Sequence, residues 1–291
     1  MAQEAEGLMM NEKDARADAE GAMTVTGFTA EIVSATDAER ATEDTPAGET
    51  STDRLELIVG TSGLQRLKDS CVLVAGLGGV GSSCAEALVR GGVGTLVLID
   101  KDIVEPSNLN RQALAFTSTI GRPKADVMRE MALDINPNVH IVAAQMYLPA
   151  QGMGEVLEEF LVDVPHLDYV VDAIDTVSQK LALAEWCQAQ GTPEISAMGA
   201  ANKLDPCRLR FARIEDTSIC PLARIMRKGC RARGIHDLEV IYSDEQPLEM
   251  PPVSDEEWAK NGAPLGTMSY LPPIMGQMIA SRVIRDLLGW Q

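Results

Sequence analysis

The feature that most constrains this chain is a cluster of glycines between an apolar run and a helical segment. The run at 71–75 is apolar, a helix is expected over 82–90, and a second apolar run at 95–99 ends at Asp100. The glycines between the first run and the helix are Gly76, Gly78, Gly79 and Gly81. A strand, a glycine turn and a helix in this order form a corner where backbone amides face a phosphate group. The sequence therefore predicts a nucleotide site in which Asp100 accepts hydrogen bonds from ribose hydroxyls.

Short apolar runs and helical segments continue to alternate along the chain. Further strands are expected at 140–144, 168–174 and 194–198, and further helices at 123–135, 154–161 and 177–190. This alternation predicts an α/β fold of the Rossmann-like, doubly wound type with a mostly parallel sheet. A composition with 45% hydrophobic but only 4% aromatic residues suits the aliphatic core of such a sheet.

Two flanking regions complete the predicted domain. Before the glycine loop, 54–70 is expected to form two short helices separated by a turn at Gly60. Beyond 205 the pattern is looser, with strands expected at 208–214 and 238–243, a basic helix at 221–235 and a closing helix at 273–288. We therefore expect a main domain over 51–291, within which 206–270 is a C-terminal substrate-binding segment.

Acidic residues dominate the beginning of the chain. Residues 1–53 contain 13 acidic and 3 basic residues, in a chain whose net charge is −18. A segment with high charge and few large apolar residues cannot bury enough surface to fold, so 1–50 is expected to be a disordered extension. An acidic chain is also a poor general binder of nucleic acid, and any such contact needs a local basic patch.

One basic patch lies at 222–235, where no acidic residue occurs. Its basic residues are Arg224, Arg227, Lys228, Arg231 and Arg233. Arg224, Lys228 and Arg231 recur at helical spacing and share one face. Such a face can follow a phosphate backbone. The alternative is a solvated helix face, or a face that pairs with the acidic residues at 237–257.

Polar and basic residues crowd the segment after Asp100, and they help to separate the possible nucleotides. They are Asn108, Arg111, Gln112 and Lys124. A hydride-transfer site needs an apolar slot for nicotinamide, whereas a triphosphate that loses pyrophosphate needs cations against its bridging oxygens. The cluster favours ATP, although Arg111 or Lys124 taken singly is more typical of a solvated surface charge.

Two aspartates follow the strand expected at 168–174. Asp172 and Asp175 lie at the carboxyl end of that strand, the edge at which open α/β sheets bind ligands. A carboxylate there can hold Mg²⁺ against phosphates. The alternative for Asp175 is a cap on the helix that starts near Val177.

The cysteines and histidines suggest no further cofactor. The six cysteines form no C-x-x-C pair, which argues against zinc, and their scatter is typical of a reducing cytoplasm. Cys71, Cys84 and Cys187 are expected in the core, and the three histidines form no cluster. No apolar run approaches the roughly 18 residues of a membrane span. We expect a cytoplasmic protein without a membrane partner.

Taken together, these residues resemble the family of ubiquitin-activating-enzyme-like, or ThiF-type, enzymes, which adenylate carboxylates. That family builds its site for ATP and Mg²⁺ from a G-x-G-G-x-G loop, an acid, an N-x-x-R-Q segment, a lysine and a D-x-x-D pair. The resemblance implies that Arg111, Lys124 and Asp175 are catalytic. It implies an ATP site formed by Gly76, Gly78, Gly79, Gly81, Asp100, Asn108, Arg111, Gln112 and Lys124, and magnesium ligation by Asp175 and Asp172.

The family also implies a role for an arginine that precedes the glycine loop. In this sequence that residue is Arg54, which would reach the ATP of a partner subunit in a homodimer. The alternative is an ordinary arginine on a helix surface. The resemblance leaves open a monovalent cation and sulfur-transfer partners of the cysteine desulfurase type.

Several stretches are similar to one branch of the family, which acts on tRNA carrying N6-threonylcarbamoyladenosine. They are MGAANKLDPCRLR, CPLARIMRKGCRARGI, VIYSDEQPLE and GTMSYLPPIMGQMIASRVIRDL, and the resemblance covers about 54–288. It implies that ATP activates the carboxylate of the modified base, which then cyclises with net loss of water, and that the basic patch binds tRNA. Two departures fall in the substrate part, namely Ala201 for glycine and Cys220 for aspartate.

Two other functions remain as alternatives. The first is an adenylyltransferase that activates the C-terminus of a ubiquitin-like sulfur-carrier protein, with a zinc site or with a cysteine such as Cys220 as thioester nucleophile. The second is an NAD(P)-binding oxidoreductase or a nucleotide-binding module without catalysis.

Overall fold

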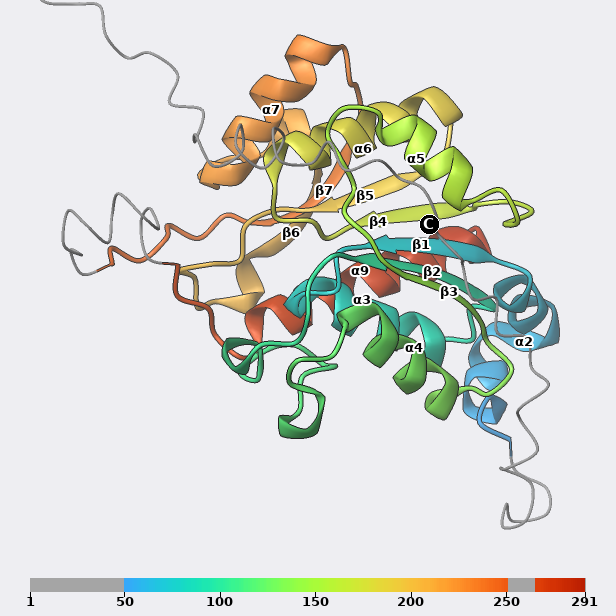
Figure 1. Ribbon diagram of the computed structural model, residues 1–291. Coiled ribbons are helices and arrows are strands. Elements are labelled where there is room, and N and C mark those ends of the chain that lie inside the picture. The colour runs from blue at the N-terminus through green and yellow to red at the C-terminus, as the bar shows by residue number, and fades with distance from the viewer. Residues whose placement is uncertain (1–49, 251–264, 291) are drawn as a thin grey trace, which may run out of the picture.

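The strands form one sheet through the middle of the molecule. The computed structural model describes residues 50–250 and 265–290. The extension expected at 1–50 therefore lies outside the described residues except for Thr50, as does the 251–264 part of the expected substrate segment. The strands of the sheet are β1 (Cys71–Ala75), β2 (Thr95–Asp100), β3 (His140–Gln145), β4 (Tyr169–Asp172), β5 (Glu194–Ala197), β6 (Leu209–Arg213) and β7 (Glu239–Ser243). Their order is β3-β2-β1-β4-β5-β7-β6 (Figure 1), and every neighbouring pair is parallel except β6 with β7.

The strand order reverses at β1. This strand pairs with β2 on one side and with β4 on the other, so the connections after β1 and after β4 lead in opposite directions. Such a switch point leaves a crevice outside the carboxyl ends of the strands, where open α/β sheets bind their ligands. The predicted doubly wound, mostly parallel α/β fold is therefore confirmed.

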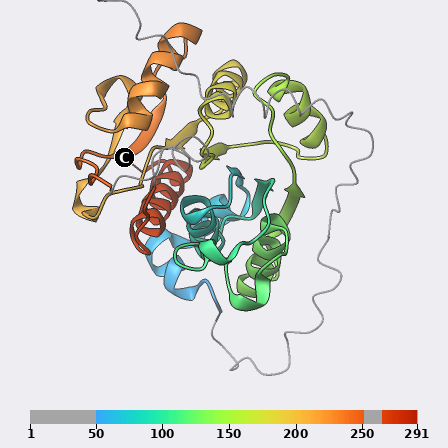
Figure 2. The ribbon, with the colours of Figure 1, turned by 60° about the vertical axis from the view of Figure 1, so that its left-hand side comes forward.

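Helices cover both faces of the sheet (Figures 1 and 2). They are α2 (Asp53–Lys68), α3 (Gly79–Arg90), α4 (Lys124–Ile135), α5 (Met153–Phe160), α6 (Val177–Gln190), α7 (Pro221–Arg233) and α9 (Leu271–Leu288). Short 3-10 turns lie at Pro106–Asn108, Thr117–Thr119, Pro206–Arg208 and Ile214–Asp216. Gly60 breaks α2 with a φ of 71°, which confirms the predicted turn. No helix in the described ranges is long and apolar enough to cross a membrane.

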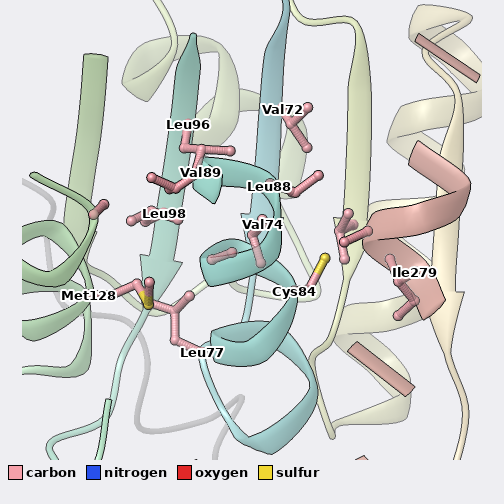
Figure 3. Close-up of a cluster of buried hydrophobic side chains, with 14 of the residues drawn as sticks. Val72, Val74, Leu77, Cys84, Leu88, Val89, Leu96, Leu98, Met128 and Ile279 are labelled. Carbon is pink, nitrogen blue, oxygen red and sulfur yellow. The ribbon is translucent and has the colours of Figure 1, made fainter. Parts of the chain in front are cut away.

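Alternation along the strands divides the core in two. Val72 and Val74 of β1 belong to the cluster under α3, α4 and α9, whereas Leu73 and Ala75 belong to the cluster under α5 and α6. Successive side chains of a strand point to opposite faces, so a strand that is buried on both faces is apolar throughout. Figure 3 shows the first cluster, with Val72, Val74, Leu96 and Leu98 gathered against Cys84, Leu88, Val89, Met128 and Ile279.

The closing helix α9 packs closely along α3. A Cβ atom at Gly276 would lie 2.2 Å from the carbonyl oxygen of Val80, so only glycine allows this approach. Pro272, at the start of α9, lies against Gly79, where an added Cβ would be 2.9 Å from the proline ring. The helix that carries the glycine loop is thus held between the sheet and α9.

Candidate functional site

A cavity of about 670 Å³ opens at the carboxyl edge of the sheet, beside the switch point. Most of the predicted site residues line it: Gly76, Gly78, Gly79, Asp100, Asn108, Arg111, Gln112, Lys124 and Asp175. Gly81, Asp172, Arg54 and the basic residues of α7 do not line it. The structure therefore brings together residues from five separate stretches of the chain, as the motif spacing predicts.

The glycine loop connects β1 to α3 by a turn that excludes side chains at two positions. Gly76 has a φ of +88°, and an added Cβ would lie 2.7 Å from the carbonyl oxygen of Ala173. A Cβ on Gly81 would lie 1.8 Å from the carbonyl oxygen of Gly76. At Gly78 the nearest atom to an added Cβ is 4.0 Å away, so this glycine keeps the loop surface open to a ligand. The three glycines therefore meet different steric constraints: Gly76 and Gly81 face backbone atoms, whereas Gly78 faces open space.

Asp100 connects this loop to the second strand. Its side chain is buried, and one carboxylate oxygen accepts a hydrogen bond from the backbone N–H of Leu77, within the loop. The other oxygen accepts from the N–H of Asp102 at 2.8 Å. Burial raises the pKa of Asp100, and the nearby Lys124 ammonium opposes that rise. Besides lining the cavity where a ribose would lie, Asp100 therefore anchors the loop, a role that the motif alone does not reveal.

Two cations reach the cavity from the segment after Asp100. Lys124 is the first residue of α4, is 5% exposed, and has its Nζ 3.3 Å from an Asp102 carboxylate oxygen. Arg111 donates from Nη1 to the carbonyl oxygen of Ser107 at 3.0 Å and to Oδ1 of Asn110 at 2.8 Å. These contacts hold both charges at the cavity, which is the arrangement that a polyphosphate requires.

The amides beside these cations complete the wall. Asn108 is buried, and its Oδ1 accepts from the backbone N–H of Glu105 at 3.1 Å, which fixes the turn that carries Arg111. The Oε1 atom of Gln112 is buried without a hydrogen-bond partner in the described part of the chain. A buried acceptor of this kind needs a donor, and a ribose hydroxyl would supply one.

The two aspartates after β4 are in different environments. Asp175 is exposed, lines the cavity, and accepts a hydrogen bond from Thr176 Oγ1 at 3.2 Å. Asp172 is fully buried, and Lys180, Ser196 and the backbone of Ile174 occupy its carboxylate oxygens. Of the two predicted magnesium ligands, the geometry favours Asp175 and gives Asp172 contacts within the protein only. No cluster of three or more metal-binding side chains occurs in the ranges that the structure describes. One carboxylate with phosphate oxygens and water is nevertheless a usual set for Mg²⁺.

Several helices begin at the cavity. Residues from the first turns of α3, α4, α6, α7 and α9 line it, namely Gly79, Lys124, Gln179, Pro221 and Pro272. The amino end of each helix carries a partial positive charge and free backbone N–H groups. In a chain of net charge −18, this convergence makes the cavity a favourable place for an anion.

The cavity continues past the phosphate loop into a second part, which we call the β5–α7 lobe. It is lined by Met198, Gly199, Ala200, Ala201, Asn202, Lys203, Cys220 and Leu222. Lys203 is buried, its Nζ donates to the carbonyl oxygen of Ser243 at 2.8 Å, and burial lowers its pKa. Ala201 and Cys220, the two departures from the family branch, both lie in this lobe. Lys203 was not among the predicted site residues, although it lies only two residues after the departure at Ala201.

The remaining predicted residues lie outside the cavity lining. Arg224, Lys228 and Arg231 are exposed on α7, whereas Arg227 donates to Thr217 and Arg233 pairs with Glu185 at 3.0 Å. Arg54 is exposed on α2. Arg224, Lys228 and Arg231 are therefore exposed on this helix, and Arg233 is exposed as well but paired with Glu185.

The cysteines differ sharply in access. Cys207 is exposed, whereas Cys71, Cys84, Cys187, Cys220 and Cys230 are buried, which confirms the core positions predicted for three of them. Burial raises the pKa of Cys71 to about 12 and that of Cys230 to about 11. Because the thiolate is the reactive form, we expect these two thiols to react slowly in the folded chain.

We therefore expect the folded protein to react rapidly with a disulfide reagent at a single thiol. The Cys207→Ser variant should lose this fast phase, and the other thiols should react only after unfolding. The measurement is the time course of labelling in native buffer and in denaturant. A second fast thiol that ATP protects would point to Cys220 in the cavity and would contradict this expectation.

Residues 52–291 match the model of the ThiF family, and the chain therefore belongs to that family. A Bacillus subtilis protein named tRNA threonylcarbamoyladenosine dehydratase is 41% identical over 243 residues, which are 81% of this chain and 93% of the relative. The crystal structure of Escherichia coli tRNA N6-threonylcarbamoyladenosine dehydratase in complex with ATP matches with a TM-score of 0.70 and 27% identity, over 80% of this chain and 92% of that chain. The sulfur carrier protein ThiS adenylyltransferase of E. coli is 40% identical, but over 48% of this chain and 53% of its own length.

Proposed function

We propose that this protein uses ATP to activate the carboxylate of N6-threonylcarbamoyladenosine in tRNA and closes the activated group to its cyclic form. The observation that carries the proposal is the continuity of the cavity, which joins a phosphate loop with two cations to the β5–α7 lobe. The similarity to the Bacillus dehydratase over four-fifths of the chain supports the substrate class. The match to the sulfur-carrier adenylyltransferase extends over about half of the chain and gives less support to that alternative.

The first step is adenylation. The substrate carboxylate attacks the α-phosphorus of ATP, the bond to the bridging oxygen breaks, and pyrophosphate leaves. Arg111 and Lys124 stabilise the charge that grows on the leaving phosphates, while the backbone of the loop at Gly78 and the amino end of α3 bind the phosphate oxygens. Mg²⁺ bound to Asp175 would neutralise further charge on the phosphates.

The second step is ring closure. A nucleophile within the threonylcarbamoyl side chain attacks the activated carbonyl carbon, loses its proton, and AMP leaves with one of the original carboxylate oxygens. The modified base has then lost the elements of water. Lys203 and Cys220 of the β5–α7 lobe are buried, and an activated group held against them would be shielded from water on that side.

Two measurements test this function. Titration of the melting temperature should show stabilisation by ATP with Mg²⁺ that exceeds stabilisation by NAD, and the reverse order would overturn the ATP site. Incubation with ATP and tRNA carrying the modified base should convert that base to a product lighter by one water. If the base is unchanged while a sulfur-carrier protein gains AMP, the adenylyltransferase alternative is correct.

We further propose that α7 binds the tRNA backbone. Changing Arg224, Lys228 and Arg231 together to alanine should weaken tRNA binding and lower the slope of log affinity against log salt by about 2. The Lys68, Arg90 and Arg285 triple alanine variant removes three exposed charges elsewhere and should leave the slope unchanged. Equal slopes for the two triple variants would place the tRNA on another surface.

The homodimer and the role of Arg54 belong to the same proposal. Leu57 and Ile58 on α2 are 84% and 74% exposed, an unusual state for large aliphatic side chains so close to Arg54. A second copy that covers them would bring Arg54 to the neighbouring ATP. Light scattering of the Leu57→Glu variant should show a smaller species than the wild type, and an unchanged mass would contradict this interface. The cytoplasmic location, the monovalent cation and the sulfur-transfer partners stay predictions.

A further inference from the structure

A buried ion pair binds the backbone of the short segment that connects β4 to Asp175. Lys180 of α6 and Asp172 of β4 both have side chains that are 0% exposed, and Nζ of Lys180 lies 2.9 Å from Oδ2 of Asp172. Removing two charges from water is costly, and a pair of apolar residues would often stabilise a fold as well. A buried pair at this place therefore calls for a reason beyond stability.

The ion pair forms hydrogen bonds with both backbone polar groups of one residue, Ile174, and we call this arrangement the Ile174 clamp. The N–H of Ile174 donates to Oδ1 of Asp172 at 3.1 Å, and its carbonyl oxygen accepts from Nζ of Lys180 at 3.0 Å. Ser196 of β5 donates from Oγ to Oδ2 of Asp172 at 2.6 Å, which fixes the carboxylate from a neighbouring strand. Ile174 therefore has both of its backbone polar groups bonded to the ion pair.

The Ile174 clamp lies between the glycine loop and Asp175, which are two parts of the candidate nucleotide site. One residue before Ile174, Ala173 donates its N–H to the carbonyl oxygen of Ala75 at 2.8 Å, and its own carbonyl packs against Gly76. One residue after Ile174, Asp175 lines the cavity. The backbone direction at Ile174 therefore sets both the wall under the glycine loop and the position from which the Asp175 carboxylate extends.

We propose that Lys180 and Asp172 are positioning residues that aim the Asp175 carboxylate at the magnesium ion of bound Mg·ATP. The inference rests on the proposed ATP site, and it replaces the predicted role of Asp172 as a metal ligand by an indirect one. Groups that orient a ligand carboxylate commonly change metal affinity by ten- to a hundredfold when they are removed, without contacting the metal.

The test is the binding of ATP to the full-length chain by calorimetry, with Mg²⁺ and with EDTA. The D172N/K180M variant removes both charges of the pair together, and it loses the bond to the carbonyl of Ile174. The neighbouring Glu194 carboxyl, whose pKa burial raises well above its usual value, stays in place. We expect its affinity for Mg·ATP to fall about tenfold, while its affinity for ATP in EDTA stays within about twofold of the wild type. The E239Q/R282M variant removes another ion pair, whose atoms are 3.0 Å apart, together with the second bond of Arg282 to Asp286 at 3.1 Å, and it should change neither affinity.

A mutant cycle with Asp175 separates positioning from general support of the fold. D175N alone should show the same selective loss as D172N/K180M, and the triple variant should lose little more, because both changes remove one interaction. Losses that add in full, or a D172N/K180M variant that binds Mg·ATP as the wild type does, would overturn the proposal.

Two further outcomes keep the inference apart from the proposed function. A wild type that binds no ATP in either buffer contradicts the proposed function itself, and a wild type that binds ATP equally with and without Mg²⁺ contradicts only the positioning role. If the melting temperature shows that D172N/K180M does not fold, K180R provides the same measurement. Its planar guanidinium keeps the charge but does not reproduce the paired contacts of the ammonium, so we expect the same selective loss.

Discussion

Replacement of Gly81 by alanine should abolish ATP binding and destabilise the whole domain. The added Cβ would lie 1.8 Å from the carbonyl oxygen of Gly76 and 3.2 Å from Cβ of Ala173, so α3 and the loop cannot both keep their positions. Overpacking by a methyl group at a rigid backbone contact costs about 3 kcal/mol, the upper part of the usual range. Urea unfolding measures the loss of stability, and calorimetry with Mg·ATP measures the loss of binding.

Two other glycines provide matched controls. At Gly78 an added Cβ has free space, so Gly78→Ala should keep the stability of the wild type and yet bind ATP more weakly, because the methyl group faces the phosphates. Gly154 is the second residue of α5 and an added Cβ would have its nearest contact at 3.5 Å, so Gly154→Ala should keep at least the wild-type stability and bind ATP normally. Unaltered ATP binding by Gly78→Ala would mean that the phosphates lie elsewhere.

Replacement of Lys124 by methionine should lower the rate of ATP–pyrophosphate exchange by about a hundredfold or more. The side chain is buried at the first turn of α4 and aims its charge into the cavity, where the leaving phosphates gain negative charge. Because methionine has nearly the same length, the packing should be retained. The exchange of labelled pyrophosphate into ATP in the presence of modified tRNA measures this step.

The matched control for Lys124 is its neighbour Arg122. This arginine forms an exposed ion pair with Glu130 and does not line the cavity. Such surface pairs contribute about 0–1 kcal/mol, so Arg122→Gln should exchange pyrophosphate at the wild-type rate. If Lys124→Met exchanges as fast as Arg122→Gln, the charge of Lys124 has no part in the loss of pyrophosphate.

The fold was predictable because its signals are local. The strand at 71–75, the glycines after it and the acid at the end of the next strand follow each other within 30 residues, and each has a backbone requirement that few residue types meet. The helix α3 nevertheless begins at Gly79, three residues before the predicted 82, since these glycines adopt helical geometry at the end of the loop. Likewise β4 ends at Asp172, two residues before the predicted 174, because the clamp at Ile174 turns the chain away from the sheet.

The site was predictable only in part, because some roles depend on partners distant in the sequence. Asp172 and Asp175 look equivalent in the segment VVDAIDTV, and only the burial of Lys180 on the next helix separates them. Lys180 was readable as a lysine directly before the apolar run at 181–184, but its link to Ser196 through Asp172 was not. Lys203 was hidden for the same reason, since its bond to Ser243 spans 40 residues of chain.

The packing of α9 along α3 affects the stage of protein synthesis at which the nucleotide site can form. The glycine loop leaves the ribosome about 190 residues before α9, yet Gly79 and Val80 reach their final surroundings only when Pro272 and Gly276 arrive. Until then the loop lacks the helix that covers its outer side, and the nascent chain should have no affinity for nucleotide. We therefore expect ATP to bind only once nearly all of the described domain has been synthesised, and incomplete chains not to sequester the nucleotide.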